Sequence, residues 1–240
     1  MPRLYRDEGI VLRTAKLGEA DRIITLLTQH HGKIRAVAKG VRRTKSRFGA
    51  RLEPFMRVDM LLSQGRTFEG IRQVESLNVY ADPISRDYES FTVASIIAET
   101  ANDLVSTEHE PAYAQYRLLV GALHALANRR HRANAIGESY VMRALALAGW
   151  TPRLDACVVC GTQENLRYFS SRAGGVMCTL DHTPDSRPVS AVSLRQLRAL
   201  LDGDWNELDR NELEPATMQA VEHWAQTILE RPIRSMRLLD

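Results

Sequence analysis

The chain has 240 residues, with 32 lysines and arginines against 29 aspartates and glutamates, so its formal net charge is only +3. It contains no run of 18 apolar residues and no apolar N-terminal stretch, so we expect neither a membrane-spanning helix nor a secretory signal. Three cysteines do not make a disulfide framework, which favours the reducing cytoplasm.

The charge is distributed unevenly along the chain. Residues 1–80 hold 16 basic and 8 acidic side chains, which leaves 16 basic and 21 acidic side chains in residues 81–240. A positive N-terminal part favours a polyanionic partner, whereas the mildly acidic remainder must serve another purpose.

The first 80 residues show the pattern of short strands. Alternating or β-branched runs separated by glycine-containing turns predict five strands, at residues 10–13, 22–28, 34–39, 56–60 and about 68–79. Five strands in this length fit a small closed barrel, which leaves no exposed edge. An open five-stranded sheet is the alternative.

A change to helical periodicity follows Pro83. Apolar residues then share one helical face in three segments, at residues 93–101, 116–127 and 140–148. Ser193 and Gln196 form a candidate capping box, which predicts a helix beginning there. A final helix is expected over Glu214–Leu229.

The predicted fold class is α+β, with a β-barrel followed by a helical domain that a cysteine-containing loop interrupts. We expect the barrel domain to bind nucleic acid. The expected bounds are 1–80 for the barrel, 81–152 and 191–240 for the two parts of the helical domain, and 153–190 for the loop.

The loop contains a motif that can hold a metal ion. Cys157 and Cys160 are spaced C-x2-C and are followed by Gly161, so one turn brings both sulfurs to the same side. Two such thiolates are half of a typical structural Zn2+ site.

The second half of the expected metal site has only one cysteine instead of two. Cys178 supplies a third sulfur at a suitable spacing, and the fourth position of the template falls on Asp181, with His182 one residue beyond. Carboxylate and imidazole groups both bind zinc, so Cys3Asp and Cys3His sites are both open. A metal-free loop that packs through apolar contacts is the alternative.

Residues 32–51 form a basic stretch without one acidic side chain. Strand alternation would place its first three cations on one barrel face, and Phe48 could stack on a base. We expect contacts with a phosphate backbone rather than base recognition, and a solvated surface loop is the alternative. The eight cations are Lys33, Arg35, Lys39, Arg42, Arg43, Lys45, Arg47 and Arg51.

No catalytic motif is evident in the sequence. It has no P-loop, no G-x-S-x-G and no H-E-x-x-H pattern, and its acidic pairs are not placed beside a base or a metal. We therefore expect no enzyme. A zinc-dependent hydrolase acting on nucleic acid would need an open metal position, for which the sequence offers no sign.

Several motifs, in their order and spacing, resemble one known family. They are Asp7–Arg13, Gly18–Ile24, His31–Arg42, Ala144–Pro152 running into Cys157–Gly161, Phe169–Ser170 with Gly174–Gly175, and Glu230–Ser235. On these motifs the chain resembles the RecO family of bacterial DNA repair proteins over essentially its whole length.

The resemblance implies an N-terminal OB-fold, a helical C-terminal domain and a zinc-finger-like insertion. It implies a recombination mediator of the cytoplasm and nucleoid that binds single- and double-stranded DNA and anneals complementary strands. With RecR, such proteins help RecA load onto DNA coated by single-stranded DNA-binding protein (SSB), whose acidic and apolar C-terminal tail needs a groove with a basic rim and an apolar pocket. A general RNA-binding OB-fold protein without a repair role is the alternative.

The resemblance also implies a structural Zn2+ at the cysteine loop. Cys157, Cys160 and Cys178 match the family's zinc positions, whereas Asp181 stands where cysteine is usual.

Overall fold

The computed structural model describes residues 3–46 and 48–238. The chain divides into two compact units, Met1–Asn128 and Arg129–Asp240. The first unit joins the expected barrel domain to three helices, so the four domain bounds expected from the sequence stay a prediction. Within the described ranges, no helix is both long and apolar enough to span a lipid bilayer.

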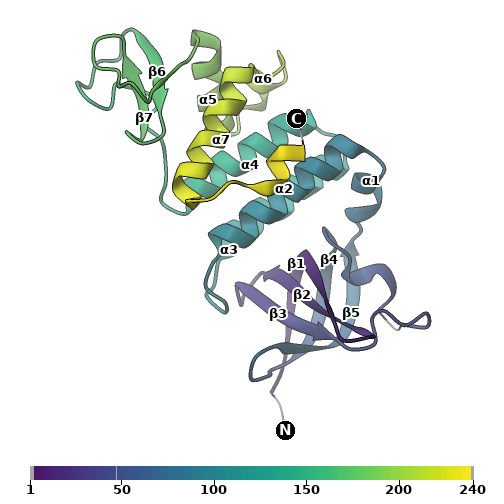
Figure 1. Ribbon diagram of the computed structural model, residues 1–240. Coiled ribbons are helices and arrows are strands. Elements are labelled where there is room, and N and C mark those ends of the chain that lie inside the picture. Colours follow the sequence, from purple (N-terminus) through teal and green to yellow (C-terminus); the bar gives the residue numbers. More distant parts are fainter. Residues whose placement is uncertain (1–2, 47, 239–240) are drawn as a thin grey trace. The chain divides into compact units, whose positions relative to one another are not determined.

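Five strands close into a barrel at the start of the chain, in the order β1-β2-β3-β5-β4 (Figure 1). Neighbouring strands are antiparallel except β3 and β5, which pair in parallel, and this arrangement is an OB-fold. The closed barrel is therefore confirmed over an open sheet. The strands are β1 (Leu4–Leu17), β2 (Asp21–Thr28), β3 (Lys33–Ala38), β4 (Arg57–Ser63) and β5 (Glu69–Asn78).

Strand β3 shows how the sequence builds the barrel. Ile34, Ala36 and Ala38 are fully buried in the barrel core, whereas Arg35 and Val37 between them are only half-buried. The period of two places the apolar residues inside, where burying an aliphatic side chain contributes about 1.5–3 kcal/mol. The same period turns the intervening side chains outward.

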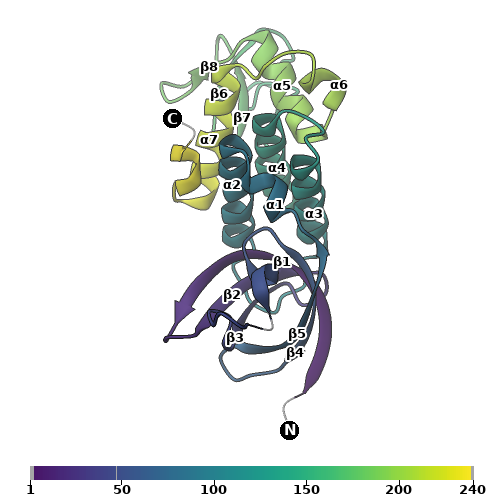
Figure 2. The same ribbon diagram turned by 90° about the vertical axis from the view of Figure 1, so that its right-hand side faces the viewer.

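Three helices complete the first unit: α1 (Ala81–Ser85), α2 (Tyr88–Leu104) and α3 (Tyr113–Ala127). Helices α2 and α3 lie side by side (Figure 2). The α3 residue Tyr116 donates its hydroxyl to Glu8 Oε1 of β1 at 2.9 Å, and Arg57 Nη2 of β4 donates to the same oxygen at 2.9 Å. This charged network attaches α3 to two strands of the barrel.

The second unit combines helices with a small sheet. Its helices are α4 (Ala133–Leu147), α5 (Ala191–Asp202), α6 (Trp205–Leu208) and α7 (Pro215–Leu229), followed by the 3-10 turn η2 (Arg234–Leu238). The sheet has the order β7-β6-β8, with β6 (Leu166–Ser170), β7 (Gly175–Cys178) and β8 (Arg187–Pro188). Helix α4 packs against α5 and α7.

One helix start differs from the prediction. Helix α5 begins at Ala191, and its N-cap is Ser190, whose hydroxyl oxygen accepts a hydrogen bond from the backbone N–H of Ser193 at 2.9 Å. Ser193 is already inside the first turn, so the expected capping box is wrong. The final helix is confirmed, with Glu214 as N-cap and Pro215 in the first turn, where its fixed φ fits.

A buried acid lies in the core of the second unit. Glu138 on α4 is 7% exposed, and its Oε2 has no hydrogen-bond partner among the described residues. Burial, with a smaller contribution from the charge of Glu222, raises the pKa of Glu138 from its ordinary value of 4.5 to about 8. The folded protein therefore keeps this proton at a pH where the unfolded chain has released it.

Glu138→Gln should remove a pH dependence of stability. Because the folded pKa is raised, the wild-type free energy of unfolding falls as the pH rises from about 4.5 to about 8. The substitution has no titrating group, so its stability gain over wild type should grow across this window, to roughly 2–4 kcal/mol at pH 8. Urea unfolding at pH 5.5 and pH 8 measures it, with exposed Glu164→Gln as control. An equal difference at both pH values would contradict the assignment.

Candidate nucleic-acid interface and metal site

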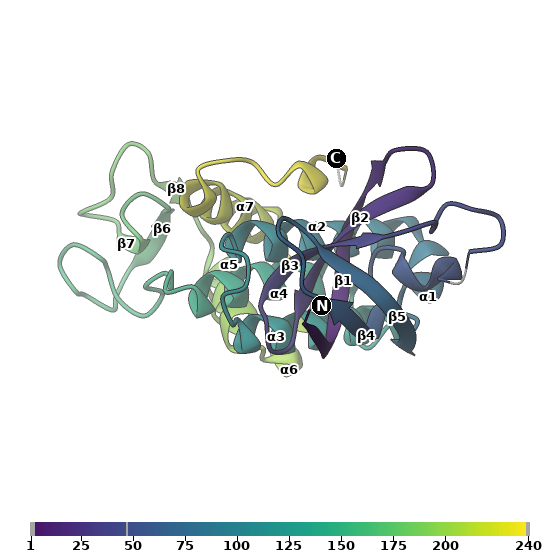
Figure 3. The ribbon, with the colours of Figure 1, turned by 90° about the horizontal axis from the view of Figure 1, so that it is seen from below.

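The loop after β3 is hydrogen-bonded to the turn between β1 and β2 (Figure 3). The backbone N–H of Gly40 donates to Asp21 Oδ1 at 2.7 Å, and Arg42 Nη1 donates to the carbonyl oxygens of Gly18 and Glu19 at 3.2 and 2.9 Å. Part of the basic stretch is thus held in place by the barrel. The guanidinium of Arg42 makes two of these hydrogen bonds.

Most of the predicted cations are exposed to solvent. Lys39, Arg43, Lys45 and Arg51 are exposed on the segment that follows β3. Arg47, also predicted to contact nucleic acid, lies outside the described residues. The exposed members form a cationic surface on one loop of the barrel, which suits a phosphate backbone.

Lys33 differs from the prediction that it shares an open face with Arg35 and Lys39. Its side chain is nearly buried, and its Nζ donates to the backbone carbonyl oxygen of Asn102 at 2.9 Å. A buried cation needs such an oxygen partner, so Lys33 links β3 to the end of α2 instead of facing solvent. It is therefore not a candidate for DNA contact in this structure.

Arg35 faces outward but is engaged by its neighbours. Its Nε is ion-paired with Glu108, which lies between α2 and α3, and its guanidinium lies 5.0 Å from the ring centroid of Phe68. The ion pair offsets much of the positive charge of Arg35. Arg35 is therefore a weaker candidate for contacting phosphate than the sequence suggested.

The predicted base-stacking residue is in the core. Phe48 is 1% exposed and packs among the apolar side chains of the barrel interior, so its ring is not accessible to a base. The half-buried Phe68, in the turn between β4 and β5, is an aromatic ring that lies beside a cation of the basic stretch. No motif in the sequence points to Phe68, although Gly65 and Arg66 mark its turn.

The three cysteines and Asp181 come together in the second unit. One ligand atom from each of Cys157, Cys160, Cys178 and Asp181 lies within 4.8 Å of the others. The Sγ atoms of Cys160 and Cys178 are 3.8 Å apart, and Cys178 Sγ is 3.2 Å from Asp181 Oδ2. A tetrahedron with Zn–S bonds of about 2.3 Å has S–S edges of about 3.8 Å, so this donor set fits zinc.

His182 is not part of this cluster. Its ring stacks on Tyr168 with centroids 4.0 Å apart, and its Nδ1 lies 3.1 Å from the carbonyl oxygen of Thr179. Of the two fourth ligands that the sequence left open, the described structure therefore favours Asp181.

Backbone pairing brings the two halves of the cluster together. The N–H of Val176 donates to the carbonyl oxygen of Arg153 at 2.9 Å, and the N–H of Arg153 donates to that of Gly174 at 2.9 Å. At Gly175 a Cβ atom would lie 2.2 Å from the Arg153 carbonyl oxygen, so no larger residue fits this approach. The segment that leads to Cys157 is thereby aligned with the strand that ends at Cys178.

The cluster also favours the thiolate form of one cysteine. Burial raises the pKa of Cys157, but backbone N–H groups, foremost that of Cys160 and then that of Cys178, lower it to a net value of about 7. A hydrogen bond with Asp181 raises the pKa of Cys160. Zinc binds thiolates and carboxylates, so these four groups would hold the ion and it would supply a structural cross-link to the loop.

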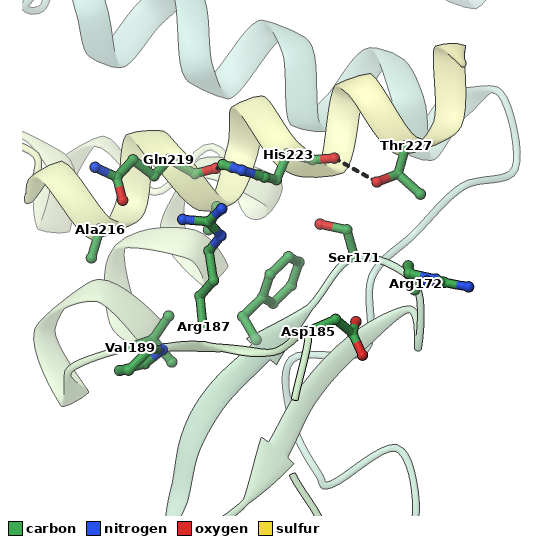
Figure 4. A pocket seen from close by; sticks show the side chains of 12 residues that line it. Ser171, Arg172, Asp185, Arg187, Val189, Ala216, Gln219, His223 and Thr227 are labelled. Carbon is green, nitrogen blue, oxygen red and sulfur yellow. Dashed lines mark hydrogen bonds between the residues drawn. The ribbon is translucent and has the colours of Figure 1, made fainter. Parts of the chain in front are cut away.

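A groove of about 230 Å³ lies between α7 and the small sheet (Figure 4). Its apolar wall includes Phe169, Val189 and Ala220. Figure 4 shows Arg187 of β8 extending toward Gln219 and His223 of α7. Arg172 and Asp185 lie at the opposite part of the groove, so its rim is polar and carries two arginines and one aspartate.

Two family models match nearly the whole chain. One, described as Recombination protein O N terminal, matches residues 1–80, and the other, Recombination protein O C terminal, matches residues 85–237. The chain belongs to the RecO family.

Relatives of the RecO family agree over the full length. Curated proteins named DNA repair protein RecO from Bifidobacterium animalis subsp. lactis, Nocardioides sp. and Thermobifida fusca are 63%, 44% and 44% identical to this chain. The alignments cover 99% of this chain in each case, and 99%, 99% and 98% of the relatives. RecO membership gives this chain a role in DNA repair, and the N-terminal family model covers the barrel that carries the cationic loop.

Asp181→Cys should strengthen zinc binding by this RecO-family chain. A fourth thiolate is a better zinc ligand than a carboxylate, so we expect about tenfold or more higher affinity, and lower affinity for Asp181→Ala. Competition with a coloured chelator measures the Zn2+ affinity of each variant. His182→Ala is the control and should bind like wild type. Zinc loss in His182→Ala but not in Asp181→Ala would contradict the ligand assignment.

Proposed function

We propose that this chain is a recombination mediator that binds single- and double-stranded DNA, anneals complementary strands and, with RecR, helps RecA load onto SSB-coated DNA. The observation that carries the proposal is a RecO-family OB barrel with exposed cations on the loop after β3, which is hydrogen-bonded to the barrel. The function needs no covalent step, so we propose that the protein is not an enzyme. It would act in the cytoplasm, at the nucleoid.

The physical task of such a protein is to reduce repulsion between two polyanions. Lys39, Arg43, Lys45 and Arg51 would neutralise phosphates of one strand and release its condensed counterions. Contacts of this kind leave the base edges free, so a second strand can pair with the bound one. The same physics makes binding independent of sequence and sensitive to salt.

The groove in the second unit has the chemistry expected of a site for the SSB tail. Apolar side chains of that tail would enter between Phe169, Val189 and Ala220, and its carboxylates would meet Arg187 and Arg172. RecR and RecA are proposed as partners from family membership, without an assignment to residues.

The cysteine cluster is proposed as a structural zinc site. A single ion held by Cys157, Cys160, Cys178 and Asp181 would fix a loop that has little apolar core of its own. It would stabilise the small sheet that forms one wall of the groove.

Annealing of SSB-coated complementary strands, with and without RecR, tests the function, and Arg43→Ala/Lys45→Ala tests its electrostatic basis. If each side chain contacts one phosphate, the double substitution should reduce the magnitude of the log–log salt slope by about 1.4 and slow annealing. Arg129→Ala/Arg130→Ala removes equal charge outside the barrel and is the control. Absence of annealing, or tighter binding of structured RNA than of single-stranded DNA, would overturn the proposal.

Arg187→Glu should weaken binding of a peptide with the SSB tail sequence by about tenfold, because it places a carboxylate where the acidic peptide needs a cation. DNA binding should not change. Fluorescence anisotropy of a labelled peptide measures the affinity, with Arg210→Glu, an exposed position, as the matched control. Equal peptide binding by both variants would show that the tail binds elsewhere.

A further inference from the structure

The turn between β4 and β5 holds an aromatic ring in a fixed place beside β3. Strands β3 and β5 pair in parallel, with Ala36 opposite Glu69, so Arg35 of β3 lies beside Phe68 in the turn just before β5. The guanidinium of Arg35 lies 5.0 Å from the ring centroid of Phe68, which is within cation–π range.

The cation beside Phe68 is itself held from the other side. Glu108 is ion-paired with Arg35, and the segment that carries Glu108 is joined to β3 by a hydrogen bond from the N–H of His109 to the carbonyl oxygen of Lys33 at 3.0 Å. The position of the guanidinium is therefore set before any ligand arrives. Its charge is largely offset, so its main effect is to orient the ring.

The turn that carries Phe68 is tight. At Gly65 a Cβ atom would lie 1.9 Å from the carbonyl oxygen of Phe68, so the backbone passes too closely for any larger residue. Below the turn, Arg72 Nε donates to Ser63 Oγ at 2.9 Å and joins the two strands. Phe68 thus has a defined position, and exposed Arg66 lies in the same turn.

We propose that Phe68, oriented by Arg35 and Glu108, is a stacking site for an unpaired base of single-stranded DNA. The inference rests on the proposed function and deepens it, because the cationic loop accounts for phosphate contacts and leaves base contacts unassigned. Every base has a π face, so stacking adds affinity without sequence preference. A base inside a duplex is already stacked, so the site distinguishes single strands from double strands.

Phe68→Ala should weaken binding of oligo(dT) about tenfold. Two further results separate stacking from charge: the salt slope should stay at the wild-type value, and binding of a blunt duplex should not change. Phe68→Leu keeps most of the apolar volume and should also lose affinity, whereas Phe68→Trp should keep it. Fluorescence anisotropy at several salt concentrations measures the affinity for oligo(dT), its salt slope and the affinity for the duplex.

Phe91→Ala is the matched control, since Phe91 is 44% exposed on α2 and belongs to neither the turn nor the cationic loop. Thermal unfolding verifies that each variant is folded, and Phe68→Leu preserves the test if Phe68→Ala is not. Wild-type affinity of Phe68→Leu for oligo(dT), or equal losses on single strands and duplex, overturns the stacking site alone. A wild-type protein that binds neither form at low salt overturns the proposed function, and the inference with it.

Discussion

The barrel closes through a short parallel pairing between β3 and β5, and the arrangement of the candidate nucleic-acid interface depends on this closure. Only Ala36–Glu69 and Val37–Gly70 are paired there. The contact places the turn that carries Phe68 beside the basic strand, although strand β4 lies between the two segments in the chain. Without closure, the loop after β3 and the β4–β5 turn would belong to opposite edges of an open sheet.

Charge within the basic stretch serves two purposes in the structure. Lys33, Arg35 and Arg42 bind carbonyl oxygens or a carboxylate and thereby hold β3 and the loops around it. Other cations of the stretch, such as Arg43 and Lys45, face solvent. A basic run in the sequence therefore does not show which cations hold the neighbouring loops in place and which face solvent. The fixed members position the exposed ones, which would lower the entropy lost on binding a polyanion.

The candidate metal site in the second unit also combines a local motif with a distant segment. The spacing of Cys157 and Cys160 sets one half locally, through a turn that needs no long-range contact. The other half reaches it through backbone pairing of Arg153 with the strand that ends at Cys178. The fourth ligand position depends on which of two adjacent side chains faces the cysteines. His182 stacks on Tyr168, whereas Asp181 lies in the cysteine cluster.

The sequence by itself determined the elements with a clear period: the barrel strands, the main helices, and the cysteine spacing of the metal loop. These follow from which side chains must be buried along one strand or helix, a property of neighbours in the chain. Only the tertiary structure decided that Phe48 is in the core while Phe68 is at the surface, and that Lys33 is bound to Asn102. Such outcomes depend on which distant segment covers a residue. Local patterns of charge and hydrophobicity carry no information about that partner.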